Sequence, residues 1–486
     1  MGEVLGHLTP SGLWKHFEEI CKRPHPSKKE EQLVEYVVGF GKKNNLETIK
    51  DDFGNVLIKK PATPGMESRK TVVLQGHLDM VPETNTGSTF NFEKDPIEPR
   101  VEGDWVKANG TTLGSDNGIG VAATLAVLES NDVEHGPIEA LFTLDEETGM
   151  FGAAALKPDF MKGEIMLNMD SEEDGALYIG CAGGKNTYAK FDYTGNDAPA
   201  KTIAYEVTVS GLKGGHSGLD IHMGKGNAIK ILGRLLWEME AKFDIRLSKI
   251  NAGSKHNAIP RESFAVVRIK EKLAEEFVES LLEFNNKIKN ELGAVEPGFK
   301  ITAEPVKSKG KVIDKKTTGN LLKALYAVPH GVLKMSADIA GLVETSTNLA
   351  VIKTTGKAVS IITSQRSSVD SEKVDAANTV AAVFNLAKAD VKFGDDYPGW
   401  QPDINSPILG VMKERYKAAY GTDPEIKAIH AGLETGIIKE KYPDMDMISF
   451  GPTIMGAHSP DERVQISTVS KFWDILVDVL KNIPAK

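Results

Sequence analysis

The chain has 486 residues, a length at which one hydrophobic core usually gives way to two or more domains. Its 58 Lys and Arg against 68 Asp and Glu leave a formal net charge of −10, which argues against nucleic acid as a partner. No apolar run is long enough to span a membrane, no signal-peptide pattern opens the chain, and two cysteines are too few for a disulfide framework. Together these features predict a cytoplasmic protein that does not bind membranes.

Helical and strand patterns alternate over the first 185 residues. Amphipathic spacing predicts helices over 13–22 and 28–44, and a third helix over 118–132. Apolar runs predict strands over 55–60, 70–78, 138–144 and 164–169. Continuous apolar strands separated by helices are typical of the α/β class, so we expect a mostly parallel twisted sheet with helices on both faces.

The middle of the chain has a different pattern. Alternating strands are predicted over 204–212, 262–270, 300–307, 346–355 and 358–368, with helices over 226–242, 272–293 and 318–329. The second half of this stretch repeats the scheme of the first weakly, which predicts an inserted α+β domain of two lobes with antiparallel strands. The Pro- and Gly-rich segment YPGWQPD (397–403) has the character of a boundary. We therefore expect a discontinuous domain of residues 1–186 and 397–486, interrupted by an inserted domain of residues 187–396.

Five short segments rich in metal-binding side chains are expected to follow strands of the first domain. They are GHLDM (76–80), GSDNG (114–118), LDEETG (144–149), NMDSEED (168–174) and GAHSPDE (456–462). In open α/β sheets, ligands bind outside the carboxyl ends of the strands, so these distant segments should converge there. A set of two His and several Asp or Glu is what a two-metal hydrolase needs to hold its ions and to activate water.

The first two segments supply three candidates. His77 and Asp79 are two residues apart at a strand end, so their side chains point to the same side. A neutral imidazole is a good zinc ligand, and a nearby carboxylate can orient it. Asp116 could bridge two ions through its two oxygens, although taken alone it also fits the cap of a helix.

The other three segments supply four more. Glu146 and Glu147 leave an apolar strand side by side, so one could bind metal while the other acts as a general base. A solvated turn is the alternative for this pair. Asp170 ends another apolar run and His458 lies in a Gly-Ala-His-Ser-Pro loop, so both could complete the ligand set.

Longer motifs give the chain a family resemblance along its whole length. The segments that carry it are QGHLDMV, GTTLGSDNGIGVA, DEETGM, NMDSEEDGALYIGCAGG, GLKGGHSG, HNAIPRE, YPGWQPD, HAGLETG and SFGPTIMGAHSPDE. In this order they resemble the di-zinc aminopeptidase/carboxypeptidase superfamily, and most of all its aminoacyl-histidine dipeptidases. No departure from the metal-binding pattern of that family is visible.

The resemblance implies a role for each candidate. Asp116 would bridge two metal ions, with His77 and Asp170 completing one site and Glu147 and His458 the other. Glu146 would be the general base, and Asp79 would support His77.

The resemblance also implies substrate-binding groups. The catalytic domain of that family carries an inserted α+β lid, which would correspond to the inserted domain of residues 187–396. Closure of this lid would bring His216 to the tetrahedral intermediate, and Asn257, Arg366 and Gly432 would bind substrate. The alternatives are a lid turn for His216, the start of a strand for Asn257 and a surface charge for Arg366.

The activity implied is hydrolysis of unblocked dipeptides, Xaa-His dipeptides included, by a cytosolic enzyme with two divalent ions. Zinc fits best, and Mn²⁺ or Co²⁺ suit the same donors. Two alternatives remain, an N-acyl-amino-acid amidohydrolase on the same site and a metal-stabilised scaffold protein. The resemblance also makes a homodimer through the lid possible, and the alternative is that a large lid with two lobes supplies internally what a partner supplies elsewhere.

Overall fold

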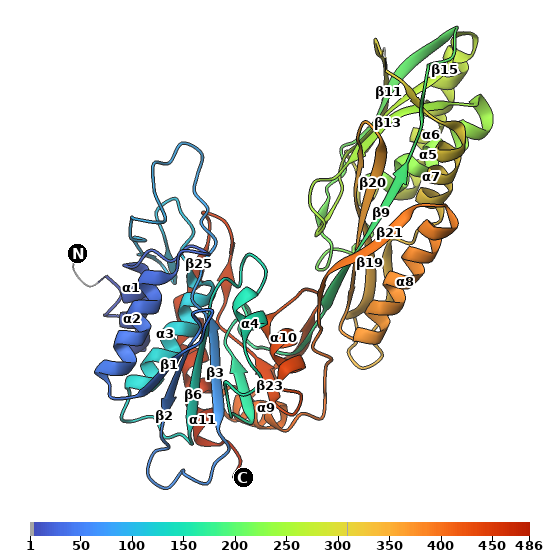
Figure 1. Ribbon diagram of the computed structural model, residues 1–486. Coiled ribbons are helices and arrows are strands. Elements are labelled where there is room, and N and C mark those ends of the chain that lie inside the picture. Colours follow the sequence, from blue (N-terminus) through green and yellow to red (C-terminus); the bar gives the residue numbers. More distant parts are fainter. Residues whose placement is uncertain (1–3, 309) are drawn as a thin grey trace. The chain divides into compact units, whose positions relative to one another are not determined.

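The computed structural model describes residues 4–308 and 310–486, and they form two compact units (Figure 1). The first unit comprises Met1–Cys181, Trp400–Ala428 and Leu433–Lys486. The second unit comprises Ala182–Gly399 and Ile429–Gly432. Among the described residues, no helix is long and apolar enough to cross a membrane.

The first unit is built on an eight-stranded sheet in the order β1-β2-β6-β3-β7-β23-β8-β22. Its four central strands β6, β3, β7 and β23 run parallel, while β1, β2 and β8 pair antiparallel with their neighbours. The central strands β3 and β6 are buried along their whole length, which explains their continuous apolar runs. The predicted α/β class is therefore confirmed.

The helices and strands of this unit are α1 (Ser11–Cys21), α2 (Glu31–Lys43), β1 (Glu47–Lys50), β2 (Val56–Lys60), β3 (Val72–His77), β4 (Arg100–Glu102), β5 (Trp105–Lys107), α3 (Ser115–Glu129), β6 (Ile138–Thr143), α4 (Phe151–Ala155), β7 (Ile165–Asn168), β8 (Ala176–Cys181), α9 (Pro407–Tyr420), β22 (Glu425–Ile429), α10 (Glu434–Lys441), β23 (Asp446–Ser449), β24 (Ile454–Met455), β25 (Arg463–Gln465) and α11 (Ile466–Lys481). Helix α3 packs against β3 and α1, and α9 packs against β23 and α11. Almost every residue of α3 is buried, so this helix is apolar on all sides rather than amphipathic.

The second unit is built on one antiparallel sheet in the order β16-β11-β15-β13-β19-β20-β9-β21, with β18 paired to β19. Its elements are β9 (Gly183–Asp192), β10 (Gly195–Asn196), β11 (Thr202–Ser210), β12 (Gly215–His216), α5 (Ala228–Phe243), β13 (Arg246–Ala252), β14 (Ala258–Ile259), β15 (Ser263–Lys270), the 3-10 helix η1 (Glu271–Leu273), α6 (Ala274–Leu292), β16 (Lys300–Pro305), β17 (Val312–Ile313), α7 (Lys315–Ala327), β18 (Gly331–Met335), β19 (Val343–Thr354), β20 (Ala358–Ser367), α8 (Asp370–Leu386) and β21 (Asp390–Tyr397). Helices α5 to α8 lie together along this sheet (Figure 1), and their apolar side chains form one core with it.

The weak sequence repeat corresponds to a structural repeat within this sheet. The half β16-β11-β15-β13 and the half β21-β9-β20-β19 have the same strand order, and each half contains two of the four long helices. The halves meet edge to edge, with Asn251 of β13 opposite Lys353 of β19. Two α+β halves are thus present, but they share one sheet and one core instead of standing as separate lobes.

One expectation about the first unit was wrong. The GSDNG segment does not follow a strand of the large sheet, because the preceding strand β5 belongs to a small four-stranded sheet of β24, β25, β5 and β4. The segment instead opens helix α3, and the packing of α3 against β3 brings its first turn to the carboxyl edge of the large sheet.

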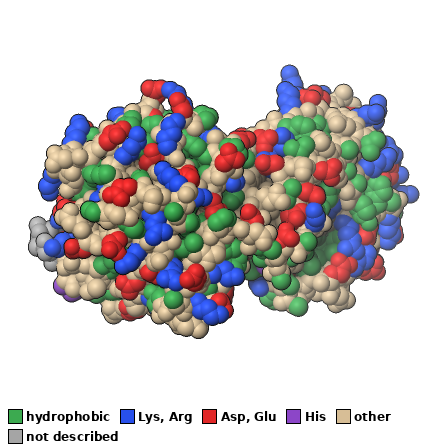
Figure 2. Space-filling model, turned by 90° about the horizontal axis from the view of Figure 1, so that it is seen from below, with side chains coloured by type: hydrophobic (Ala, Val, Ile, Leu, Met, Phe, Trp, Pro, Cys, Tyr) green, Lys and Arg blue, Asp and Glu red, His purple; other side chains and the backbone are tan. Residues whose placement is uncertain are grey.

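Charged side chains of both signs lie intermingled on the face of each unit that Figure 2 shows. This mixture agrees with the modest negative net charge of −10.

Candidate functional site

The carboxyl ends of three neighbouring strands supply most of the candidate metal ligands. His77 is the last residue of β3, while Glu146 and Glu147 follow β6 and Asp170 follows β7. The register pairs His77 with Thr143 of β6, so the residues after these strands lie level with one another. Parallel pairing therefore gathers side chains that lie up to 93 residues apart in sequence (77 to 170).

Asp116 lies between two histidines. Its Oδ1 is 3.2 Å from Nε2 of His77, and its Oδ2 is 3.2 Å from Nε2 of His458. Each histidine has a second carboxylate beside it, since Asp170 Oδ1 is 3.2 Å from His77 Nε2 and Glu147 Oε2 is 3.0 Å from His458 Nε2. The five side chains thus form two groups of three that share Asp116.

These distances fit a site for two divalent ions. Two ligands on one tetrahedral zinc ion lie about 3.3 Å apart when each is about 2.0 Å from the metal. Among the described residues, Oε1 of Glu147 and Oδ1 of Asp170 are buried and accept no hydrogen bond. Buried carboxylate oxygens normally have hydrogen-bond partners. Because these two have none among the described residues, both are free to bind cations.

Asp79 holds the neighbouring residues through both its main chain and its side chain. Nδ1 of His77 donates to the Asp79 carbonyl oxygen at 3.0 Å, which turns Nε2 toward Asp116 and Asp170, where the neutral ring would bind metal. The Asp79 carboxylate accepts the backbone N–H groups of Glu146 at 2.9 Å and Glu147 at 3.1 Å, and the Ser27 hydroxyl at 2.8 Å. This side chain therefore orients the glutamate pair as well as lying beside His77.

The cluster contains more buried carboxylates than positively charged side chains, and this imbalance shifts their pKa values. Burial raises the pKa of Glu146 well above its ordinary value and that of Glu147 to about 7. Hydrogen bonds to Asp116 and Glu147 raise the pKa of His458 to about 11. Burial opposes ionisation of Asp116, but the hydrogen bonds from His458 and His77 outweigh it and lower the pKa of this carboxyl. A bound cation would relieve the same crowding.

The second unit brings three of the four candidate substrate residues together around Ser217. The backbone N–H of Ser217 donates to the Asn257 carbonyl at 2.8 Å, and Arg366 Nε donates to the Ser217 hydroxyl at 3.3 Å. Arg366 is only 6% exposed, and its Nη1 donates to the Tyr397 hydroxyl at 3.0 Å. It forms no ion pair with the described residues, although buried arginines are normally paired. It is therefore available to an anion.

His216 adjoins this cluster in a fixed tautomer. Its Nδ1 accepts the backbone N–H groups of Gly218 at 3.2 Å and Leu219 at 3.1 Å, so the proton of the neutral ring lies on Nε2. Burial and the charge of Arg366 lower the pKa of His216 to about 4. Gly432 ends the segment Ile429–Gly432 of the second unit. In this segment the His430 carbonyl oxygen lies close to Gly218, and a Cβ added to Gly218 would be 2.0 Å from that oxygen.

Sequence patterns did not reveal two buried acids in the first unit. Glu434 accepts from Gln75 Nε2 and from the Thr143 hydroxyl, both at 2.6 Å, and burial raises its pKa to about 7. Glu462 accepts five hydrogen bonds from residues 113–116. Glu462 lies within GAHSPDE, but nothing in that motif indicates partners some 350 residues earlier in the chain.

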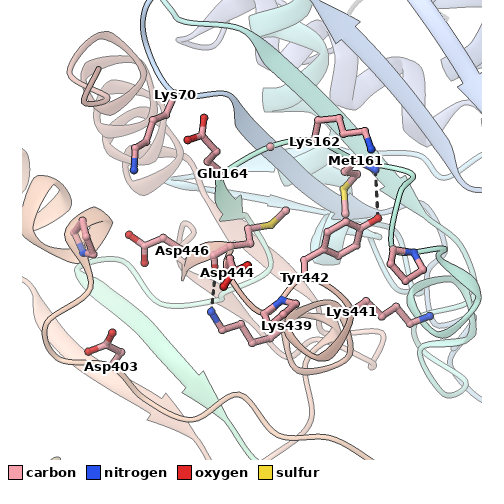
Figure 3. A pocket seen from close by; sticks show the side chains of 15 residues that line it. Lys70, Met161, Lys162, Glu164, Asp403, Lys439, Lys441, Tyr442, Asp444 and Asp446 are labelled. Carbon is pink, nitrogen blue, oxygen red and sulfur yellow. Dashed lines mark hydrogen bonds between the residues drawn. The ribbon is translucent and has the colours of Figure 1, made fainter. Parts of the chain in front are cut away.

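A cavity of about 710 Å³ lies elsewhere in the first unit, at the amino ends of the parallel strands (Figure 3). Lys70 and Glu164 precede β3 and β7, and Asp446 begins β23. Asp446 already accepts two hydrogen bonds from the start of α9, and Lys439 donates to the Met445 carbonyl at 2.8 Å. The candidate metal ligands line the opposite edge of the sheet.

Comparisons with known proteins agree with this geometry. The model of "Peptidase family M20/M25/M40" matches residues 73–482. The cytosol non-specific dipeptidase of Escherichia coli (strain K12) is 44% identical over 482 residues, which is 99% of each chain. The crystal structure of aminoacylhistidine dipeptidase from Vibrio alginolyticus is 46% identical, with a TM-score of 0.92 over 100% of this chain and 99% of that one.

A more distant structure shares the fold alone. The aminopeptidase PepT from Bacillus cereus ATCC 10987 is 14% identical, with a TM-score of 0.58 over 98% of this chain and 99% of that one. The sheet with its converging histidines and carboxylates defines an α/β protein with side chains suited to divalent metal. Because the family model matches residues 73–482, well over half of the chain, the chain belongs to peptidase family M20/M25/M40. The resemblance drawn from the motifs is thereby confirmed.

Proposed function

We propose that this chain is a cytosolic, metal-dependent dipeptidase that hydrolyses unblocked dipeptides, Xaa-His dipeptides included. Similarity over almost the whole chain to a cytosol non-specific dipeptidase and to an aminoacylhistidine dipeptidase supports this substrate class and location. The observation that carries the proposal is Asp116, whose two oxygens each lie 3.2 Å from a histidine.

In this proposal the chain holds two divalent ions. His77, Asp116 and Asp170 would bind one, and Asp116, Glu147 and His458 the other. Zinc fits these nitrogen and oxygen donors best, and Mn²⁺ or Co²⁺ suit the same set. When bound, two such ions lower the pKa of water and polarise the scissile carbonyl.

Glu146 would move the proton. It would take a proton from the attacking water and deliver it to the nitrogen of the leaving amine. The carboxylate has an atom within 4.8 Å of ligand atoms of His77 and Glu147, so it lies at the site without being needed to complete either group of three. Burial raises its pKa and bound cations would lower it, so the carboxylate could both take up the proton and release it. Asp79 would keep Glu146 in place, because its carboxylate accepts the main-chain N–H of Glu146.

The second unit would supply the substrate-binding groups. His216 would donate its Nε2 proton to the developing oxyanion, because Nδ1 is already occupied as an acceptor. Arg366 would pair with the free carboxylate of the dipeptide, since its buried guanidinium has no anionic partner among the residues that the structure describes. Asn257 and Gly432 would bind substrate beside them.

The two units would then correspond to a catalytic domain and a lid. The boundaries predicted from sequence are 1–186 with 397–486 for the catalytic domain and 187–396 for the lid. The homodimer through the lid stays a prediction, and sedimentation velocity on the purified chain measures it directly.

The test compares wild type with Glu146→Gln on unblocked dipeptides and on N-acetyl amino acids, with bound zinc measured on both proteins. We expect wild type to cleave the unblocked dipeptides alone, and the variant to keep its zinc while losing turnover. Cleavage of only the N-acetylated compounds would make the chain an amidohydrolase. A variant with most of the wild-type rate would overturn the role of Glu146.

A further inference from the structure

Glu462 is a buried carboxylate for which the proposed reaction has no use. It is 3% exposed. Its Oε2 accepts the backbone N–H groups of Leu113 at 2.7 Å and Gly114 at 3.0 Å. Its Oε1 accepts the Ser115 N–H at 2.7 Å, the Ser115 hydroxyl at 2.6 Å and the Asp116 N–H at 3.3 Å. One side chain thus binds four consecutive residues that end at Asp116.

The N-cap residue of α3 supplies no side-chain acceptor for the N–H groups of the turn that Glu462 binds. The first N–H groups of a helix lack partners within the helix, and a side chain at the N-cap usually supplies one. Here the N-cap of α3 is Gly114, which has a left-handed conformation with φ of 71° and offers no side chain. Asp116 departs from helical geometry as well, with φ of −87° and ψ of 106°. The carboxylate of Glu462 therefore replaces the missing cap and holds an irregular turn.

Glu462 also belongs to the loop that carries His458. Its backbone N–H donates to the Ser459 carbonyl at 3.0 Å, and the Ser459 hydroxyl donates to the Gly456 carbonyl at 2.7 Å. These two hydrogen bonds hold the loop in a compact turn between Gly456 and Glu462. It meets the turn of residues 113–116 at two places, through the carboxylate of Glu462 and through the 3.2 Å contact of His458 with Asp116.

We propose that Glu462 is a positioning residue that fixes the turn of residues 113–116 against the loop of residues 456–462, so that Asp116 and His458 face each other at the separation a shared cation requires. The inference rests on the proposed two-metal site. It assigns to Glu462 no contact with metal or substrate, because among the described residues every hydrogen bond of its carboxylate goes to the turn. The consequence is that metal affinity, and not only folding, depends on this carboxylate.

The test measures zinc affinity in Glu462→Gln by equilibrium competition with a chromogenic chelator. The amide keeps the size of the side chain, but its NH₂ group must face N–H donors of the turn, so the turn shifts. Loss of groups that orient metal ligands typically weakens affinity by about 10- to 100-fold, and we expect a loss in this range. Excess zinc should restore part of the turnover.

Glu139→Gln is the matched control. Glu139 is 4% exposed and accepts the backbone N–H groups of Lys162 at 2.7 Å and Gly163 at 2.9 Å. Glu139 lies near the amino end of β6, away from the candidate ligands. Its substitution should therefore lower stability and leave zinc affinity within about twofold of wild type. Equal zinc affinity in both variants and wild type would overturn the proposal and leave Glu462 as a cap of α3.

Ser115→Ala covers the case in which Glu462→Gln does not fold. It removes one bond to the carboxylate and leaves the four N–H groups, so we expect zinc affinity to fall by about 10-fold, the low end of the effect of one hydrogen bond to a charged group. Unchanged affinity in Ser115→Ala would then overturn the proposal. If wild type itself binds no zinc, the proposed function fails before the role of Glu462 is reached.

Discussion

Replacing Asp79 by Asn tests how the glutamate pair is oriented. The Asp79 carboxylate accepts the Glu146 N–H through Oδ1 and the Glu147 N–H through Oδ2. In the variant, whichever position the amide nitrogen takes, one of these N–H groups loses its acceptor and faces a donor. Because the residue is only 1% exposed, water cannot readily replace the lost bond.

The expected magnitude follows from the loss of one hydrogen bond to a charged group, about 1.5–3 kcal/mol. If that energy is lost from the transition state, kcat/KM on an unblocked dipeptide should fall about 10- to 150-fold at saturating zinc. Ser27→Ala is the control, since it removes the third bond to Asp79 and leaves both glutamates held. It should cost about threefold. The reasoning would be refuted if kcat/KM of Asp79→Asn stayed within twofold of wild type. It would also be refuted if Ser27→Ala lowered kcat/KM as much as Asp79→Asn does.

Three further predictions concern the second unit. Arg366→Met should raise KM for unblocked dipeptides about 10- to 100-fold, through loss of a charge-assisted pair, without affecting dipeptide amides, which steady-state kinetics on both substrates checks. His216→Ala should lower kcat about 10²- to 10³-fold with bound zinc unchanged, as loss of an oxyanion donor does; an equal loss of zinc would contradict it. Burial lowers the pKa of His430 to about 3 in the folded chain against 6.5 when unfolded, so the unfolded chain takes up the proton first as pH falls. Through this group alone, the unfolding free energy of the unit should drop by about 2 kcal/mol from pH 7.5 to 5, and denaturant titration of His430→Asn should show a total drop that is smaller by that amount.

The alternation of strands and helices in the first unit was predictable because its central strands are buried on both faces. The runs 138–144 and 164–169 correspond to β6 (Ile138–Thr143) and β7 (Ile165–Asn168). Strand β13 and helix α8 were missed. Residues of β13 alternate between buried and partly exposed while including Arg246 and Lys249, and α8 combines a small apolar face of alanines with many polar residues.

The candidate ligands were predictable because each stands in a short motif beside a strand or turn. The structure brings His77, Asp116, Glu147, Asp170 and His458 together. The turn that presents Asp116 was not predictable in the same way, because its cap is Glu462, 346 residues later in the chain. Hydrogen bonds over such separations leave no periodicity or spacing in a single sequence.

The shared carboxylate of Asp116 is tested most directly by titrating metal-stripped protein with zinc while dipeptide hydrolysis and bound zinc are both measured. We predict that zinc binds to two equivalents per chain and that hydrolysis reaches its maximum only as the second is filled. Full activity at one equivalent, with no second ion bound, would contradict a site in which Asp116 joins two ions.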